Sequence, residues 1–348
     1  MTVDSDGVIS DEPILPMIVD SAEEVLLKKP VFEEKSCQTG FEEIFDAGAA
    51  NFTLIDILCS DKAMNSCAGL HSLSQFQSLC KSVDYTMKEL DVNPRFKLDT
   101  PSRVLLTLMK LKLNVSFRCL SCFFKISERA ASECFFYTID ILESILKQFI
   151  IWFPREKIRE NLPIHFVMFR DTRAVLDCAE IPVQISKCLN CSVRTYSHYK
   201  GRHTLKFLLA VAPDGTIVFV SVLYGGRASD KFIVNDCNIL DLFEAGDAVM
   251  VDKGFEIADE CTNCNLKLHR PPYYSALRKQ FPADEVDLCR TIARARVHVE
   301  RTIQRIRIFK IFHGQLPWSL IDYGDKMLTV VCALVNLSPP ILESKRFL

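Results

Sequence analysis

Residues 205–223, LKFLLAVAPDGTIVFVSVL, have the pattern of a β-hairpin. Two apolar runs, 205–211 and 216–223, are joined by Pro213, Asp214 and Gly215. Proline fixes φ, aspartate hydrogen-bonds its own backbone and glycine tolerates positive φ, so these residue types favour a tight turn. The stretch therefore predicts two strands joined by a short turn.

Apolar segments on either side of the hairpin extend the predicted sheet. Residues 173–183 and 248–251 have strand character, whereas residues 291–309 return to a helical period. The order along the chain is strand, hairpin, helix, strand, helix. This order predicts an α/β fold in which a mixed sheet is flanked by helices.

The segment before the sheet is predicted to be helical. From Ser66 onward, apolar residues recur at spacings of three and four, as on one face of an amphipathic helix. They are Leu70, Leu73, Phe76, Leu79 and Cys80. Thr100 followed by Pro101 has the pattern of a helix N-cap and first helical residue.

Two further helices are expected after residue 113, separated by a tight break. Asn114 or Ser116 would cap the first, and Ser127 the second, which runs toward residue 150. With a break at residues 125–127, this arrangement is typical of a helix-turn-helix. In a DNA-binding version the last helix would enter the groove. Its early polar residues are Glu128, Arg129, Ser132 and Glu133. Only one of these four is basic, so a purely structural helix pair stays an alternative.

Charge is distributed unevenly along the chain, although the net charge is only −2. Residues 1–60 contain thirteen Asp or Glu against three Lys, and the remainder contains 39 Lys or Arg against 31 acids. The acidic segment also lacks a sustained apolar period, which is typical of a disordered tail. The basic remainder suits a polyanionic partner such as DNA.

The composition does not favour a membrane or secreted protein. The longest apolar runs, such as residues 217–224, are far shorter than a membrane span, and the acidic N-terminal residues do not resemble a secretion signal. We therefore expect an intracellular protein with reduced thiols, although the chain contains 15 cysteines. Three Cys-x-x-Cys pairs, at 119/122, 188/191 and 261/264, leave structural zinc as an alternative.

Two aspartates stand where strand-like apolar runs end. Asp177 follows the run 174–176, and Asp252 follows the run 249–251. A carboxylate placed after a buried strand emerges where the sheet meets solvent, which is the usual location of sites in α/β folds. The structural alternative for each aspartate is a loop acid or a helix cap.

Glu300 lies on the predicted helix 291–309, at the border of its buried face. That face comprises Ile292, Ala295, Val299, Ile303 and Ile306. From this border Glu300 can reach the edge of the sheet. The structural alternative is a surface salt bridge with Arg296 or Arg307.

Basic residues form two clusters that could contact phosphates. The first is a stripe on the helix around Glu300: Arg290, Arg294, Arg301 and Arg305. The second leads into the hairpin: Lys200, Arg202, His203 and Lys206. The alternative for the stripe is an ordinary solvated helix face.

Four stretches of the chain resemble the sequence blocks of the DDE endonuclease family, as found in Harbinger-like and THAP-linked transposases. They are VLDCAEI (175–181), YSHYKGRHTLKFLLAVAPDGTIVFVSVLYGGRASDKFI (196–233), VMVDKGF (249–255) and IARARVHVERTIQRIRIFKIF (292–312). The resemblance covers roughly residues 65–340. It is specific because the four blocks occur in the family's order, whereas any three acids could match by chance.

The resemblance implies an RNase H-like fold and a site. Asp177, Asp252 and Glu300 match the family's catalytic, metal-binding acids, and Asp230 would line the site, with a helix N-cap as its structural alternative. Three carboxylates suit a pair of Mg²⁺ or Mn²⁺ ions, which activate the attacking oxygen and stabilise the leaving one. The implied function is a transposase-like endonuclease that cleaves and joins DNA phosphodiesters. A catalytically inactive, transposase-derived DNA-binding or protein-interaction factor is the alternative.

The resemblance also implies partners and a location. We expect DNA as the partner, a homo-oligomer and a nuclear location. A separate DNA-binding protein is a further expected partner, because residues 1–60 do not resemble the zinc-coordinating module of THAP-linked relatives. The expected organisation is an acidic tail (1–60), a helical, helix-turn-helix-like region (65–155), an endonuclease domain (165–320) and a C-terminal helix and tail (321–348).

Overall fold

The computed structural model describes residues 60–90, 96–272 and 283–341. All of these residues belong to a single structural unit. The predicted acidic tail, up to residue 59, lies outside the described residues. No helix in the described ranges is long and apolar enough to cross a membrane.

Five helices make up the described part of the N-terminal region. They are α2 (Asp61–Ala68), α3 (Leu73–Glu89), α4 (Thr100–Leu113), α5 (Phe117–Phe124) and α6 (Glu128–Leu146). Ser116 and Ser127 cap α5 and α6 as predicted, accepting hydrogen bonds from the backbone N–H groups of Cys119 and Ala130. Lys125 adopts the left-handed conformation at the predicted break, with φ of 52°. The helix-turn-helix arrangement of α5 and α6 is therefore present.

Two details of this region differ from the prediction. The helical pattern from Ser66 belongs to two helices, because Gly69 has a φ of 78° and ends α2, so that Leu70 lies in the connection. The N-cap of α4 is Asp99 and not Thr100. The Asp99 carboxylate accepts the Ser102 N–H, while the Thr100 hydroxyl donates to Asp84. Local pattern alone could not separate these two neighbouring cap residues.

Seven strands form one mixed sheet in the described part of the chain. They are β1 (Thr172–Pro182), β2 (Tyr196–Ser197), β3 (Arg202–Val211), β4 (Ile217–Val220), β5 (Tyr224–Gly225), β6 (Ala248–Met250) and β7 (Lys267–His269). β1 pairs antiparallel with β3 and parallel with β6, which in turn is parallel to β7. β4 and β5 both pair with β3. This topology confirms the predicted α/β class and is consistent with an RNase H-like fold.

The predicted hairpin is present, but its second strand is shorter than expected. β4 ends at Val220, because the next residue, Ser221, accepts the Leu208 N–H with its side-chain oxygen instead of a backbone carbonyl. β2, β5 and β7 were not predicted, since strands of two or three residues leave no measurable period in a sequence.

The remaining helices of the described residues flank the sheet. They are α7 (Arg155–Glu160), α8 (Leu189–Thr195), α9 (Asp230–Asp236), α10 (Ala258–Asn263), α11 (Ala283–Arg307) and α12 (Gly324–Asn336). On one face, Leu176 and Leu208 pack with α9 and α10. On the other, Val175 and Leu209 belong to the cluster that includes α11 and α12. The alternation of side chains along β1 and β3 therefore fills two separate cores.

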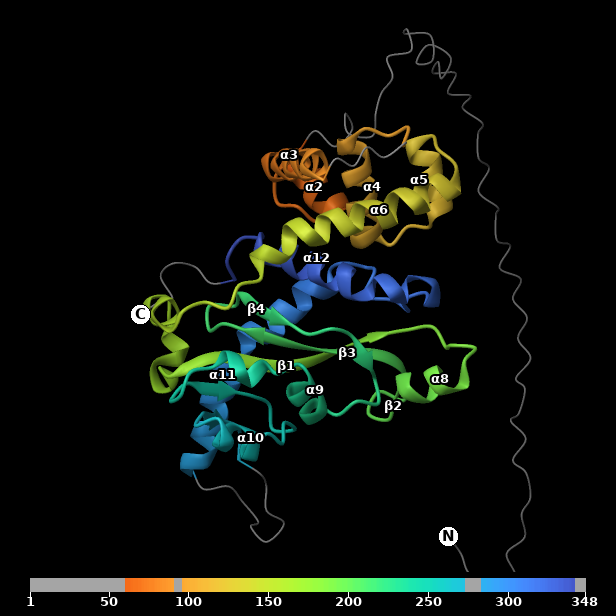
Figure 1. The fold of residues 1–348 in the computed structure, drawn as a ribbon. Helices are drawn as coiled ribbons and strands as arrows, with labels where there is room; N and C mark the ends of the chain where they lie inside the picture. Colours follow the sequence, from red (N-terminus) through yellow and green to blue (C-terminus); the bar gives the residue numbers. More distant parts are fainter. Residues whose placement is uncertain (1–59, 91–95, 273–282, 342–348) are drawn as a thin grey trace, which may run out of the picture. The chain divides into compact units, whose positions relative to one another are not determined.

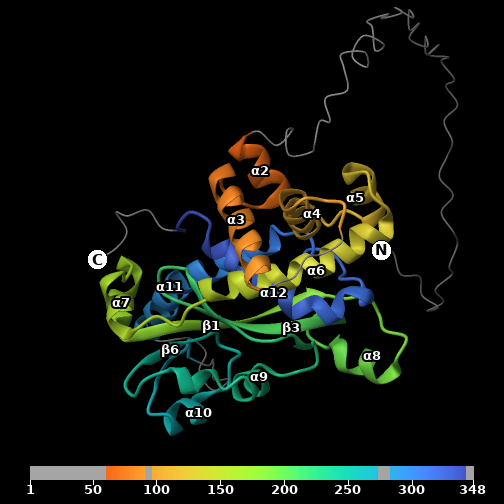
Figure 2. The same ribbon diagram turned by 45° about the horizontal axis from the view of Figure 1, so that its top comes forward.

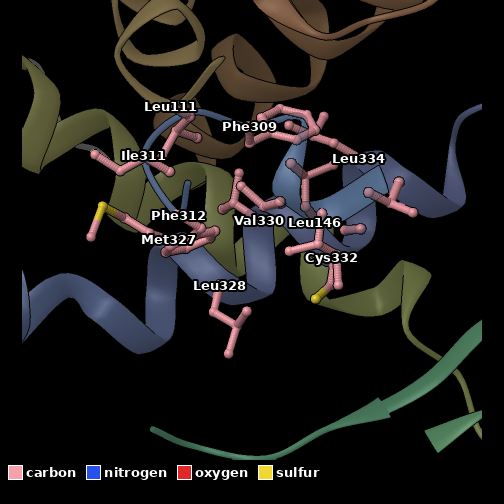
Figure 3. Close-up of a cluster of buried hydrophobic side chains, with 14 of the residues drawn as sticks. Leu111, Leu146, Phe309, Ile311, Phe312, Met327, Leu328, Val330, Cys332 and Leu334 are labelled. Atoms are coloured by element: carbon pink, nitrogen blue, oxygen red, sulfur yellow. The ribbon is translucent and has the colours of Figure 1, made fainter. Parts of the chain in front are cut away.

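The helix α12 lies between the N-terminal helices and the sheet (Figure 1, Figure 2). Its buried side chains contact both layers, so one apolar cluster runs from α4 and α6 through α12 to β1 and β3. Figure 3 shows part of this cluster, where Leu111 and Leu146 meet Phe309 and Val330. The predicted boundaries between a helical domain and an endonuclease domain stay a prediction, since the two regions share this core.

Candidate active site

A pocket of about 710 Å³ opens beside β1 and β6. It is lined by five acidic and four basic residues: Asp177, Glu180, Asp230, Asp252, Glu300, Lys200, Lys206, Arg227 and Arg307. All three predicted triad acids line it, although they come from a strand, a loop and a helix. The structure thus brings together residues that are 123 positions apart in the sequence.

The sheet register places the two aspartates side by side. Val175 on β1 is opposite Met250 on the parallel strand β6, so Asp177 and Asp252, each two residues further, lie level with one another. Asp177 is within β1 and paired with Leu209, and not at the end of a strand as expected. β1 continues past Asp177 because its partner β3 is long, whereas β6 ends at Met250 and leaves Asp252 in a loop.

Asp177 is a carboxyl group in a partly desolvated position. Burial raises its pKa to about 6, against the opposing effect of the nearby Arg296 guanidinium. The negative charges of Asp252 and Asp230 raise the pKa further. Desolvation and like charges both disfavour an ionised carboxylate, so this position would favour a bound cation.

Arg296 holds the second aspartate. Its Nη1 donates to Asp252 Oδ1 at 2.7 Å, and the Lys253 N–H donates to the same oxygen at 2.7 Å. The Arg296 side chain is 11% exposed, whereas the Asp252 side chain is 53% exposed, so a buried guanidinium holds a carboxylate that is open to solvent. The structural alternative in which Arg296 forms a salt bridge with Glu300 is therefore wrong, because Arg296 pairs with Asp252. These two donors fix the orientation of the Asp252 carboxylate.

Glu300 projects from α11 as an exposed residue at the border of the buried helix face, as predicted. Gln304 and Arg307, four and seven residues later, line the same pocket. Helical spacing alone could have found these two, since positions i, i+4 and i+7 share a face. Arg307, for which the sequence suggests a salt bridge with Glu300, lines the pocket beside it.

Asp230 lines the pocket from the first turn of α9. Its structural alternative, the N-cap, is wrong, because Ser229 caps this helix and accepts the Phe232 N–H. Lys206 forms an ion pair with Asp230 at 2.9 Å. Burial lowers the pKa of Lys206, but the hydrogen bond and charge of Asp230 raise it above its ordinary value overall. Lys206 therefore stays protonated beside the pocket.

The predicted basic clusters are only partly assembled at this pocket. Lys200 and Lys206 line it, whereas six others do not: Arg202, His203, Arg290, Arg294, Arg301 and Arg305. His203 Nδ1 lies 3.0 Å from the Thr195 hydroxyl, and Arg290 pairs with Asp287. Arg305 donates to the Pro339 carbonyl and so does not face the pocket acids. The phosphate-binding role of these six stays a prediction.

The carboxylates suit a hard divalent cation by their chemistry, because Mg²⁺ and Mn²⁺ prefer oxygen ligands. Within the described ranges, however, no group of three His, Cys, Asp or Glu residues is close enough to hold a metal ion as it stands. The Cys-x-x-Cys pairs of the described residues likewise do not belong to any group of three such side chains that could hold zinc. A metal bound by all three triad acids would therefore require their side chains to move closer together.

Fold and pocket together define a mixed α/β protein with an acidic site beside a parallel strand pair, preceded by a helix-turn-helix. Residues 176–336 match the family model described as DDE superfamily endonuclease. Residues 96–148 match the model described as helix-turn-helix of DDE superfamily endonuclease. The two matches together support a DDE superfamily endonuclease or transposase. Neither the curated proteins nor the solved structures gave a match.

Because the pKa of Asp177 is raised, ionisation of this carboxyl group should destabilise the folded protein. The folded protein binds more protons than the unfolded chain between the ordinary pKa of 3.8 and about 6, so stability falls as pH rises through this range. Asp177→Asn removes this cost and should stabilise the metal-free protein at pH 7.5 by up to roughly 3 kcal/mol. Near pH 4 the variant and the parent should differ little.

Urea unfolding in EDTA at the two pH values measures this difference. Asp259→Asn, an exposed acid on α10, is the control and should change little at either pH. An Asp177→Asn protein that is no more stable than the parent at pH 7.5 would show that the carboxyl is not desolvated.

Proposed function

We propose that the protein is a divalent-metal-dependent endonuclease that cleaves and joins DNA phosphodiesters in the manner of a transposase. The observation that carries this proposal is the single pocket lined by Asp177, Asp252 and Glu300. The matches to the endonuclease model and to its helix-turn-helix model support DNA as the substrate.

Each group at the pocket has a distinct role in this proposal. Asp177, Asp252 and Glu300 would hold the cations, which activate the attacking oxygen and stabilise the leaving oxygen. Arg296 is a positioning residue that orients Asp252 through Oδ1. Lys200 and Arg227 provide positive charge at the same pocket, where they would bind the phosphates that flank the scissile bond.

The family resemblance supports further parts of the proposal. Transposases of the Harbinger type act on DNA in the nucleus, and we propose a nuclear location and a homo-oligomer for this chain. A separate DNA-binding protein would supply sequence recognition. The polar start of α6 supports this division of labour, because Arg129 is the one basic residue among its early polar residues and lies beside Glu133.

The test of the proposed function is incubation of the full chain with labelled duplex DNA in Mg²⁺, Mn²⁺ or EDTA. We expect nicking or strand joining in the two metals and none in EDTA. The products should carry 3′-hydroxyl ends, which a DNA polymerase can extend. Equal cleavage in EDTA would contradict the metal mechanism. If the protein cleaves none of the DNA substrates, the proposed endonuclease activity is wrong.

A second candidate is a DNA-binding factor that keeps the fold without the reaction. The observation that favours it is the Arg296 ion pair on Asp252, together with the triad's lack of a preassembled three-ligand metal site within the described residues. Binding of DNA that weakens steeply with salt, without cleavage in Mg²⁺ or Mn²⁺, is the result that would support this candidate.

A further inference from the structure

Tyr199 is an aromatic ring that the fold presents to solvent at the candidate active site. Its side chain is 86% exposed, yet it lines the same pocket as Asp177 and Asp252. An exposed aromatic ring contributes no burial free energy to folding. At the rim of a functional pocket, such a ring therefore suggests a ligand that covers it.

The turn that carries Tyr199 is held by its own hydrogen bonds. Ser197, which is 1% exposed, accepts the Lys200 N–H with its hydroxyl oxygen at 3.2 Å and the Gly201 N–H with its carbonyl at 2.9 Å. Gly201 has a φ of 62°, which lets the chain reverse into β3. The ring is thus displayed by a fixed turn between two paired strands.

The positive charge next to the ring, on Lys200, suits the phosphate of a ligand that also has flat groups. Lys200 Nζ lies 4.6 Å from the centre of the Tyr199 ring, and Lys206 and Arg227 line the pocket behind it. A nucleic acid strand offers both a phosphate for the cations and a base for the ring. A protein partner of mixed charge would match this combination less well.

We infer that Tyr199 stacks on an unpaired base of the DNA strand at the pocket, while Lys200 binds the adjoining phosphate. This inference rests on the proposed function and identifies the form of DNA that the site takes. Bases inside a duplex already stack on one another, so a ring at a pocket rim reaches the face of a base only at a frayed end or in an extruded nucleotide. The site therefore prefers DNA with an unpaired end.

The experiment compares two probes in EDTA, so that binding is measured without cleavage. One is a duplex with a short single-stranded 3′ end that contains 2-aminopurine, and the other is the blunt duplex. Tyr199→Ala should weaken binding of the first probe about tenfold or more, the range found for base stacking on aromatic side chains. It should leave binding of the blunt duplex within about twofold of the parent. The parent should quench 2-aminopurine, and Tyr199→Ala should not.

Two other variants separate stacking from other roles of the residue. Tyr199→Phe keeps the ring and should retain the affinity and the quenching of the parent. Tyr85→Ala removes a tyrosine that is 66% exposed on α3 and far from the pocket residues in sequence, and should change neither probe. This control shows whether loss of any exposed tyrosine lowers DNA binding.

The outcomes distinguish the inference from the proposed function. If the parent binds both probes and Tyr199→Ala binds them equally well, the stacking role is wrong, whereas a DNA-binding function stands. Equal weakening of both probes would also contradict stacking on an unpaired base. A parent that binds neither probe at low salt would contradict both the proposed function and this inference.

Discussion

Asp252→Asn should abolish metal-dependent DNA cleavage, with a loss of roughly a thousandfold or more. Cations at such sites supply several kcal/mol of transition-state stabilisation, and each 1.4 kcal/mol corresponds to a factor of ten in rate. Asn keeps an oxygen that can accept the Arg296 hydrogen bond now made by Asp252 Oδ1. The fold should therefore survive the substitution, although a metal-binding charge is lost.

The cleavage rate in Mn²⁺ and Mn²⁺ affinity by calorimetry are the two measurements for this variant. Asp259→Asn removes an exposed acid of the same charge outside the pocket and should retain the activity of the parent. Activity of Asp252→Asn within tenfold of the parent would contradict the triad assignment. If Asp252→Asn loses both its activity and its thermal unfolding transition, it has failed to fold. Asp177→Asn then tests the triad, because we expect that variant to be inactive but more stable than the parent.

Phe309→Ala should destabilise the protein by about 3–5 kcal/mol, the range for truncation of a buried aromatic residue. Phe309 is 4% exposed and follows α11. Its ring lies under Lys112 Nζ, 5.0 Å from the ring centre, and occupies the space that a Cβ on Gly69 would need. The Phe309 side chain therefore packs the end of α11 against the N-terminal helices. Figure 3 shows it in one buried cluster with Leu111 of α4.

Urea unfolding followed by far-ultraviolet circular dichroism measures this effect. Ile308→Ala is the matched control, because this neighbour is 54% exposed and its truncation should cost less than about 1 kcal/mol. If the helical region and the sheet unfold together, tryptophan fluorescence should report the same midpoint as circular dichroism in both variants. A Phe309→Ala loss no larger than that of Ile308→Ala would show that the shared core is not tightly packed.

The local elements follow from sequence patterns because the forces that set them are local. The Pro213-Asp214-Gly215 turn predicts the hairpin, and Ser116 and Ser127 predict two helix starts through hydrogen bonds to residues three positions away. The short strands β2, β5 and β7 do not follow from sequence. Strands of this length exist only because β3 and β6 provide partners for their backbone groups.

Periodicity and ordered motifs, which need no coordinates, predict the α/β class, the helix-turn-helix and the three acids that line the pocket. The groups that surround those acids depend on the tertiary structure. The parallel register of β1 and β6 sets Asp177 level with Asp252, and the packing of α11 brings Arg296 onto Asp252. A helical wheel gives the direction of a side chain, but its partner depends on long-range packing.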